Sequence, residues 1–364
     1  MRLLKLFVLL FLLSVAAFAE RKFVNEEYDQ VTLADGIYGF IAPPPNSGVV
    51  QSNCLLIVGE DSALVVDSGQ FPSLAERMIE DVKRITGKPV RYLINTHWHF
   101  DHSWGNAQYQ AAYPGIALIS TEFTRKMLEQ EGAKTLAETP GKNLSQAKEI
   151  RDLIAKGAFS DGRPIPEEYR RMMLFNADTL EHINAEFPQT RNAPPTIGFE
   201  KELTINLGKR EVKVMWLGRA NTGGDAVVWV PDARLLATGD TVVYPIPFAF
   251  GSYMGEWPAV LQQMIDLKPA TIVPGHGIVM HDVTYLQTLH DLFLALTAQV
   301  KDAVAHGLTL EETRKRVLLP EFKAKMAGGD SMMLTQWWKG AFLEPAVDRA
   351  YQEATGKMKP ENED

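Results

Sequence analysis

A cluster of metal-ligand side chains directly after a strand-like run constrains this chain more than any other feature. Residues 92–95 have the apolar pattern of a short buried strand, and the motif Thr96-His97-Trp98-His99-Phe100-Asp101-His102 follows at once. Loops that leave the C-terminal ends of strands carry the chemistry of most α/β proteins. We therefore expect these side chains to lie together at the edge of a sheet.

The spacing within this motif predicts two neighbouring metal sites. On an extended segment His97 and His99 point the same way and can bind one ion. Asp101 and His102 follow where the chain turns into a helix, and they would face a second ion. Imidazole and carboxylate ligands favour zinc, with iron or manganese as alternatives. Surface or stacked histidines are the alternative reading, but four of these six consecutive residues are ligand types.

Two further ligand candidates follow strand-like runs far downstream. Asp240 ends the run 234–240, and His276 lies between two glycines at the end of the run 271–277. Each is ambiguous alone, because an Asp after Gly is commonly a turn residue or a helix cap. Together with the first motif they supply one bridging carboxylate and one closing imidazole.

Five motifs stand in order along the chain: Leu64-Val65-Val66-Asp67-Ser68-Gly69, the cluster from His97 to His102, Leu217-Gly218-Arg219-Ala220-Asn221-Thr222-Gly223-Gly224-Asp225, Thr238-Gly239-Asp240 and Pro274-Gly275-His276-Gly277. With these motifs the chain resembles the metallo-β-lactamase fold hydrolases from about Val31 to about His281. The resemblance implies a first metal held by His97, His99 and a third histidine. It implies a second metal held by Asp101, His102 and His276, with Asp240 bridging both ions.

The chain departs from this family at Asn221, which stands where the third histidine is expected. An amide oxygen is a weaker zinc ligand than an imidazole nitrogen, so the first site should bind its ion less tightly than the second. A role for Asn221 in hydrogen-bonding its own loop is an equal alternative.

The resemblance and the apolar patterns together predict an α/β protein, an αββα four-layer sandwich with a helical insertion and a C-terminal helical extension. The expected division is a signal peptide over 1–19, a catalytic domain over 20–285 with its insertion at about 122–195, and the extension over 286–364. We interpret the insertion as a lid over the site, and the alternatives are a neutral surface elaboration and a dimerisation arm. Strands are expected over 55–58, 63–66, 92–95, 116–119, 198–205, 211–216, 226–230 and 234–237.

The only cysteine, Cys54, lies in an apolar run and is expected to pack in the core. One subclass of β-lactamases has a zinc-binding cysteine where this chain has Asp240. The carboxylate at that position is similar to the arrangement in glyoxalase II, lactonases and alkylsulfatases.

The amino terminus has the pattern of a cleaved secretory signal: basic Arg2 and Lys5, an apolar run over 6–16, and the sequence Ala17-Phe18-Ala19. This apolar run is too short for a membrane helix, so we expect a periplasmic or secreted protein with no stable membrane insertion after cleavage. Without the signal, 35 basic residues oppose 45 acidic ones, for a net charge of −10. Such a surface repels nucleic acid.

An aromatic and proline-rich segment follows Asp240 and is expected to wall the substrate pocket. Phe248 and Tyr253 are the predicted contacts, joined by Trp98 from the first motif, and core packing is the alternative for each.

The mechanism that the resemblance implies is metal-assisted hydrolysis of a small ester, lactone, thioester or lactam. A metal-bound hydroxide would attack the carbonyl, with Asp101 and Asp240 as the catalytic carboxylates. The alternatives are a β-lactamase proper, an iron-binding redox or sulfur-handling protein, and a non-catalytic binding relative on the same fold.

Overall fold

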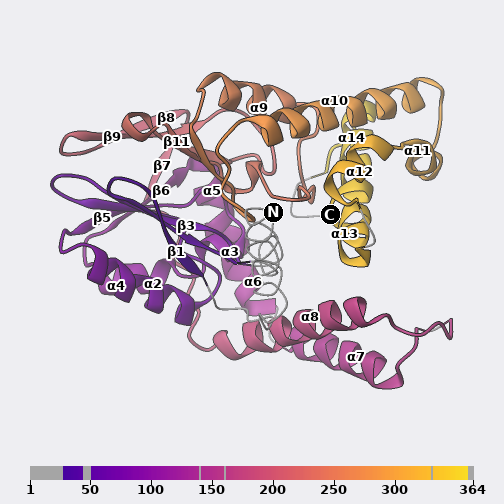
Figure 1. The fold of residues 1–364 in the computed structure, drawn as a ribbon, viewed down its shortest axis with the longest axis horizontal. Helices are drawn as coiled ribbons and strands as arrows, with labels where there is room; N and C mark the ends of the chain where they lie inside the picture. The colour runs from indigo at the N-terminus through magenta and orange to yellow at the C-terminus, as the bar shows by residue number, and fades with distance from the viewer. Residues whose placement is uncertain (1–27, 44–50, 139–140, 160, 329–330, 360–364) are drawn as a thin grey trace, which may run out of the picture.

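The computed structural model describes residues 28–43, 51–138, 141–159, 161–328 and 331–359, and Figure 1 shows its arrangement. The predicted signal peptide over 1–19 and the end of the chain after residue 359 lie outside the described residues. Within the described ranges, no helix combines the length and apolar composition needed to cross a membrane.

The first sheet has seven strands in sequence order. Four antiparallel strands come first, and β4 to β7 then run parallel to one another. Every residue of β4 and all but the last of β3 are buried, as expected for strands covered on both faces. The strands are β1 (Asp29–Ala34), β2 (Ile37–Ile41), β3 (Cys54–Val58), β4 (Ala63–Val66), β5 (Val90–Ile94), β6 (Ala117–Thr121) and β7 (Ile197–Phe199).

The second sheet has five strands, in the order β12-β11-β10-β9-β8. Its pairings are antiparallel except for β11 with β12, which run parallel. The strands are β8 (Glu202–Leu207), β9 (Arg210–Trp216), β10 (Ala226–Val230), β11 (Leu235–Ala237) and β12 (Thr271–Val273).

The two sheets pack face to face with helices outside, which confirms the predicted fold class. One buried cluster joins side chains of both sheets, for example Leu64 and Ile94 with Val214 and Val228. Helices α2 (Pro72–Ile85) and α4 (Asn106–Ala112) cover the outer face of the first sheet. Helices α9 (Trp257–Asp266) and α10 (Thr284–Ala305) cover the second (Figure 1).

The prediction of one strand over 198–205 was wrong. The chain forms β7, which pairs with β6 in the first sheet, and then β8, which pairs with β9 in the second. Glu200 and Lys201 lie between the two strands, where the chain crosses from one sheet to the other. An apolar pattern alone does not reveal such a change of partner.

Residues between β6 and β7 form helices, as the sequence predicted. They are α5 (Glu122–Met127), the π-helical turn η1 (Leu128–Gly132), α6 (Ala133–Glu138), α7 (Lys142–Lys156) and α8 (Glu167–Glu186). Helices α7 and α8 lie side by side as a hairpin (Figure 1). Arg151 of α7 joins them through ion pairs with Asp178 and Glu181 of α8.

The chain after α10 is also helical. The elements are α11 (Leu310–Arg316), α12 (Pro320–Met326), α13 (Met332–Trp337), the π-helical turn η4 (Trp338–Leu343) and α14 (Glu344–Thr355). Together with α10 they form the C-terminal extension. The apolar side chains of α10 that recur at spacings of three and four are fully buried against the second sheet and its helices: Leu286, Leu289, Phe293, Leu296 and Val300.

Candidate metal centre

The predicted ligands converge because three loops leave their strands at the same edge of the sandwich. The first loop follows β5 and leads into the short helix α3 (Phe100–Ser103). The other two follow β11 and β12, which are parallel neighbours. They bring Asp240 and His276 to the residues from His97 to His102, across the interface of the two sheets.

One group of four buried side chains could hold a metal ion and corresponds to the predicted second site: Asp101, His102, Asp240 and His276. Nε2 of His276 lies 2.9 Å from Oδ2 of Asp101 and 3.3 Å from Oδ1 of Asp240. Nε2 of His102 lies 3.3 Å and 3.2 Å from the same two oxygens. Each side chain thus points a potential ligand atom at the same small volume.

A second group could also hold an ion and corresponds to the predicted first site: His97, His99 and Asp240. Nε2 of His97 lies 3.0 Å from Nδ1 of His99 and 3.7 Å from Oδ2 of Asp240. The two carboxylate oxygens of Asp240 therefore face different groups, Oδ1 the second site and Oδ2 the first. This is the geometry expected of a bridging carboxylate.

Hydrogen bonds on the far side of three imidazole rings fix which nitrogen faces the centre. Nδ1 of His102 lies 2.8 Å from Oδ2 of Asp67, and Nδ1 of His276 lies 3.1 Å from the carbonyl oxygen of Gln51. Nδ1 of His97 lies 3.1 Å from Oγ1 of Thr96. When Nδ1 donates to these acceptors, the lone pair of Nε2 is left for a metal ion.

The electrostatics of the buried centre favour a positive charge. Burial alone lowers the pKa of His276, but the carboxylates of Asp240 and Asp101 outweigh burial and raise it to about 9. Burial likewise raises the pKa of Asp240, whereas His276 and His102 hold it well below its usual range. Burial dominates at His97, whose pKa is lowered.

The residues present fit a metal ion. Oδ1 of Asp240 is buried and accepts no hydrogen bond in the described part of the chain. A buried carboxylate oxygen that lies beside imidazole nitrogens but accepts no hydrogen bond is suited to bind a cation. Imidazole and carboxylate donors suit zinc, iron and manganese.

Two glycines allow the loops to approach this closely. A Cβ atom at Gly275 would lie 2.1 Å from Oδ1 of Asp240, and one at Gly239 would lie 2.6 Å from Cβ of Thr96. Gly239 also has a φ of 50°, a left-handed conformation that favours glycine. The loops after β11 and β12 therefore depend on glycine at both positions.

Asn221 lies in the loop between β9 and β10, and its side chain is buried. The amide nitrogen has no hydrogen-bond partner among the described residues. The adjacent backbone is fixed, because Asp225 accepts hydrogen bonds from the amide and hydroxyl of Thr222, and the amide of Ala226 donates to the carbonyl of Thr96. Direct coordination by Asn221 stays a prediction.

A pocket of about 370 Å³ opens over the ligands. Phe248 lines it, as predicted, and its ring centroid lies 5.6 Å from that of His276. Sequence reasoning missed the other lining residues outside the ligand set, which are Phe100, Phe250, Trp337 and Ala341. Nothing in the local sequence marks the last two, because they belong to the C-terminal extension.

The other two predicted substrate contacts lie elsewhere. Tyr253 is not among the residues that line this pocket; it lines a separate one with Arg219 and Glu256, and its ring stacks under the Arg219 guanidinium at 4.4 Å. Trp98 packs edge-on against His99, with ring centroids 4.7 Å apart, and also lies outside the pocket lining. Trp98 therefore packs against the candidate ligand His99 and does not line the substrate pocket.

Comparisons with known proteins agree with this geometry. The family model of the metallo-beta-lactamase superfamily matches residues 47–276, more than half of the chain. A linear primary-alkylsulfatase from a Pseudomonas species is 21% identical over 281 residues, which cover 73% of this chain and 49% of the relative. The alignment thus spans about half of that relative's length.

A type 2 metallo-beta-lactamase from Bacteroides fragilis is 21% identical over 275 residues, which cover 73% of this chain and 86% of the relative. The solved metallo-beta-lactamase from Pontibacter korlensis shares the fold with a TM-score of 0.51 and 17% identity, over 73% of this chain and 99% of its own. The chain belongs to the metallo-β-lactamase superfamily of metal-dependent hydrolases.

Proposed function

We propose that this protein hydrolyses a small ester, lactone, thioester or lactam with the help of one or two bound metal ions, zinc first among them. One observation carries the proposal: the two ligand groups share Asp240 at the floor of an open pocket. Ligands without a pocket would suit a structural metal, and a pocket without ligands would suit a binding protein.

The chain's residues divide the work by position. Asp101, His102, His276 and Asp240 would hold one ion, and His97 and His99 with Asp240 the other. A bound metal ion would polarise a carbonyl and would lower the pKa of bound water towards neutrality. Asp101 also lines the pocket, so its carboxylate can orient the attacking water. The Asn221 amide is available to donate to the oxyanion.

Sulfate esters are the second candidate substrate class. The similarity to an alkylsulfatase supports it, and the similarity to a β-lactamase supports lactams to the same degree. The metal ligands do not distinguish a carboxylic ester, a lactam and a sulfate ester, because they hold the metal ions and do not contact the leaving group. The alternative of an iron-binding redox protein would be distinguished from a zinc hydrolase by the iron that the purified protein contains.

Export to the periplasm or the medium is part of the same proposal. The basic residues, apolar run and Ala17-Phe18-Ala19 of the amino terminus support it. A small-molecule substrate fits the pocket, and the acidic net charge disfavours a nucleic acid.

The test combines metal analysis of the purified protein with a panel of carboxylic esters, lactones, thioesters, lactams and alkyl sulfates. We expect about one to two zinc ions per chain and hydrolysis of at least one class that a chelator abolishes and zinc restores. Iron as the native metal together with redox activity and no hydrolysis, or no chelator-sensitive hydrolysis of any class, would refute the proposal.

A further inference from the structure

The C-terminal extension supplies one wall of the metal pocket. Trp337, the last residue of α13, and Ala341, in the π-helical turn η4, line the pocket together with the ligands His99, Asp101 and Asp240. These two wall residues lie outside the region that the family model matches. The wall therefore comes from the part of the chain that follows the matched region.

Hydrogen bonds join this wall to the loop that carries the opposite aromatic residues. The amide of Ala249 donates to the carbonyl of Ala341 at 3.0 Å. Arg349 of α14 is 1% exposed, and its guanidinium donates to the carbonyls of Gly251 and Ser252, each at 2.9 Å. These hydrogen bonds thus join the extension and the loop beside the ligands.

Aromatic side chains dominate the lining. Phe250 is 51% exposed and Phe100 is 37% exposed, although both are large and apolar. Phe248 and Trp337 are half-buried, and the rings of Phe248 and Phe250 lie 6.4 Å apart. Covering this exposed aromatic surface with an apolar group removes it from water, which lowers the free energy of the complex. The pocket therefore presents an apolar surface directly beside the ligand cluster.

From this arrangement we infer that Trp337 is a specificity-determining residue and that the substrate carries an apolar alkyl or aryl group next to the bond that is broken. The inference rests on the proposed hydrolytic function, and it narrows the substrate class within it. The indole of Trp337 would contact that apolar group while the ligand cluster acts on the neighbouring bond.

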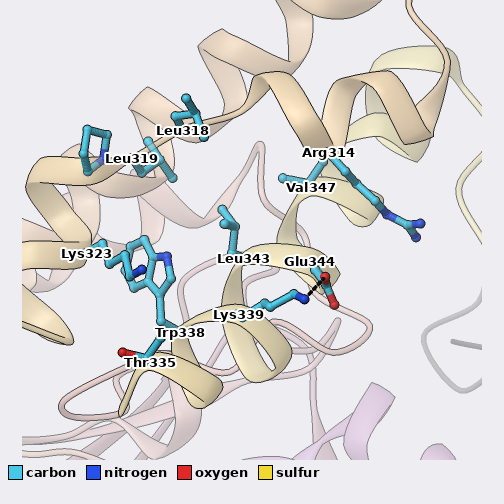
Figure 2. Close-up of a pocket in the computed structure, with 11 residues that line it drawn as sticks. Arg314, Leu318, Leu319, Lys323, Thr335, Trp338, Lys339, Leu343, Glu344 and Val347 are labelled. Atoms are coloured by element: carbon cyan, nitrogen blue, oxygen red, sulfur yellow. Dashed lines mark ion pairs between the residues drawn. The ribbon is translucent and has the colours of Figure 1, made fainter. Parts of the chain in front are cut away.

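The next residue, Trp338, provides a structural contrast. Trp338 is buried and lines a different pocket, of about 400 Å³, within the C-terminal extension (Figure 2). Leu318, which is 66% exposed, lines that second pocket too. Leu318→Ala is therefore a matched control: it removes an exposed apolar side chain from the same extension but away from the metal pocket.

The experiment measures kcat/KM for two ester series with the zinc-loaded protein, one from methyl acetate to methyl octanoate and one from methyl acetate to octyl acetate. Octanoate and acetate serve as binding probes in calorimetry. We expect Trp337→Ala to lower kcat/KM for the preferred octyl or octanoyl ester by about tenfold, and for methyl acetate by less than about twofold. The affinity for octanoate should fall by a similar factor. Trp337→Phe should retain most of the preference, and Leu318→Ala should behave as wild type.

Equal losses on short and long substrates in Trp337→Ala, or no chain-length preference of the wild type in either series, would overturn the inference while hydrolysis itself stands. A wild type that hydrolyses no ester, yet binds octanoate through Trp337, would refute ester hydrolysis and support the apolar subsite. If Trp337→Ala does not fold, as judged by thermal unfolding, Trp337→Gln, which keeps a long but polar side chain, decides the question by the same ratios.

Discussion

Oδ2 of Asp67 lies 2.8 Å from Nδ1 of His102, and this carboxylate connects the two candidate metal sites from behind. It also accepts hydrogen bonds from the amide and the hydroxyl of Thr96, each at 2.8 Å. Thr96 in turn contacts Nδ1 of His97. Asp67 adopts a left-handed backbone conformation, with φ of 57°, which is uncommon for a residue other than glycine. One residue thus orients a ligand of each site.

Asp67→Asn should weaken metal binding by about ten- to a hundredfold while leaving the fold intact. The amide is nearly isosteric but can donate to Nδ1 of His102, which would then place the ring proton on Nε2, the atom that faces the metal. Competition with a chromophoric chelator measures the affinity. Asp232→Asn, at an exposed carboxylate paired with Arg210, is the control. An unchanged affinity would mean that Asp67 does not set the ring orientation.

Asn221→His should tighten the weaker of the two sites. The buried amide would be replaced by an imidazole, which is the better zinc ligand. Wild type should titrate with one tight and one weaker zinc ion, and the variant with two ions of more similar affinity. Two equally tight ions in the wild type would contradict the assignment of a weakened first site. An unaltered titration of the variant would place Asn221 outside the coordination shell.

Asp240→Ala and His102→Ala should each lower hydrolysis by at least about a hundredfold, because each removes a ligand from the centre. Cys54→Ala should instead cost only about 1 kcal/mol of stability, since Cys54 is a buried free cysteine within β3. Burial raises the pKa of its thiol to about 12, so the thiol stays protonated and unreactive. Steady-state rates and urea unfolding of the three variants check this, and similar rates in all three would exclude the cluster as the catalytic centre.

Gly275→Ala should disturb the metal centre without touching a ligand. The new methyl group would lie 2.1 Å from Oδ1 of Asp240, so either the carboxylate or the loop must move. We expect a loss of about 1–3 kcal/mol of stability together with weaker metal binding. Gly87→Ala, at an uncrowded glycine that like Gly275 has no positive φ, controls for the Gly-to-Ala change itself. Normal zinc affinity in Gly275→Ala would show that the loop relaxes without displacing Asp240.

The helical insertion should affect substrate choice through α13. Glu168 of α8 accepts a hydrogen bond from the hydroxyl of Ser331 at 2.8 Å and from the amide of Met332 at 3.4 Å. These contacts hold the start of α13, the helix that ends at Trp337.

Glu168→Ala is accordingly expected to raise KM for long-chain substrates by about tenfold, with kcat and zinc content nearly unchanged. Its neighbour Glu167 pairs with Arg170 on the exposed face, so Glu167→Ala is the control. Unchanged kinetics combined with a change of oligomeric state in sedimentation would favour the assembly arm over the lid.

The ligand cluster could be predicted because its members are adjacent in the sequence or follow short apolar runs. His97, His99, Asp101 and His102 need only one strand and one loop. The same reasoning from the local pattern gave one strand over residues 198–205 and was wrong. The chain there pairs first with β6 and then with β9, and tertiary contacts decide this change.

Residues that reach the site over long sequence separations were beyond such reasoning. Trp337 lies 97 positions after Asp240, and only the packing of α13 brings it to the pocket. Tyr253 has the aromatic character of a pocket residue, but the cations Arg219 and Arg349 draw its ring to another surface. The sequence pattern shows which side chains are apolar, and the three-dimensional packing decides which of them share a cavity.

The origin of the ligands in both sheets has a consequence for the stability of the whole molecule. Asp101 and His102 belong to the first sheet's loops, and Asp240 and His276 to those of the second. An ion bound by all four would join the two halves of the sandwich and would bind the folded chain alone. Mass action then adds about 2.7 kcal/mol to the free energy of unfolding when free metal is a hundredfold above its dissociation constant. Resistance to heat and to proteolysis would therefore track the metal supply of the compartment in which the protein resides.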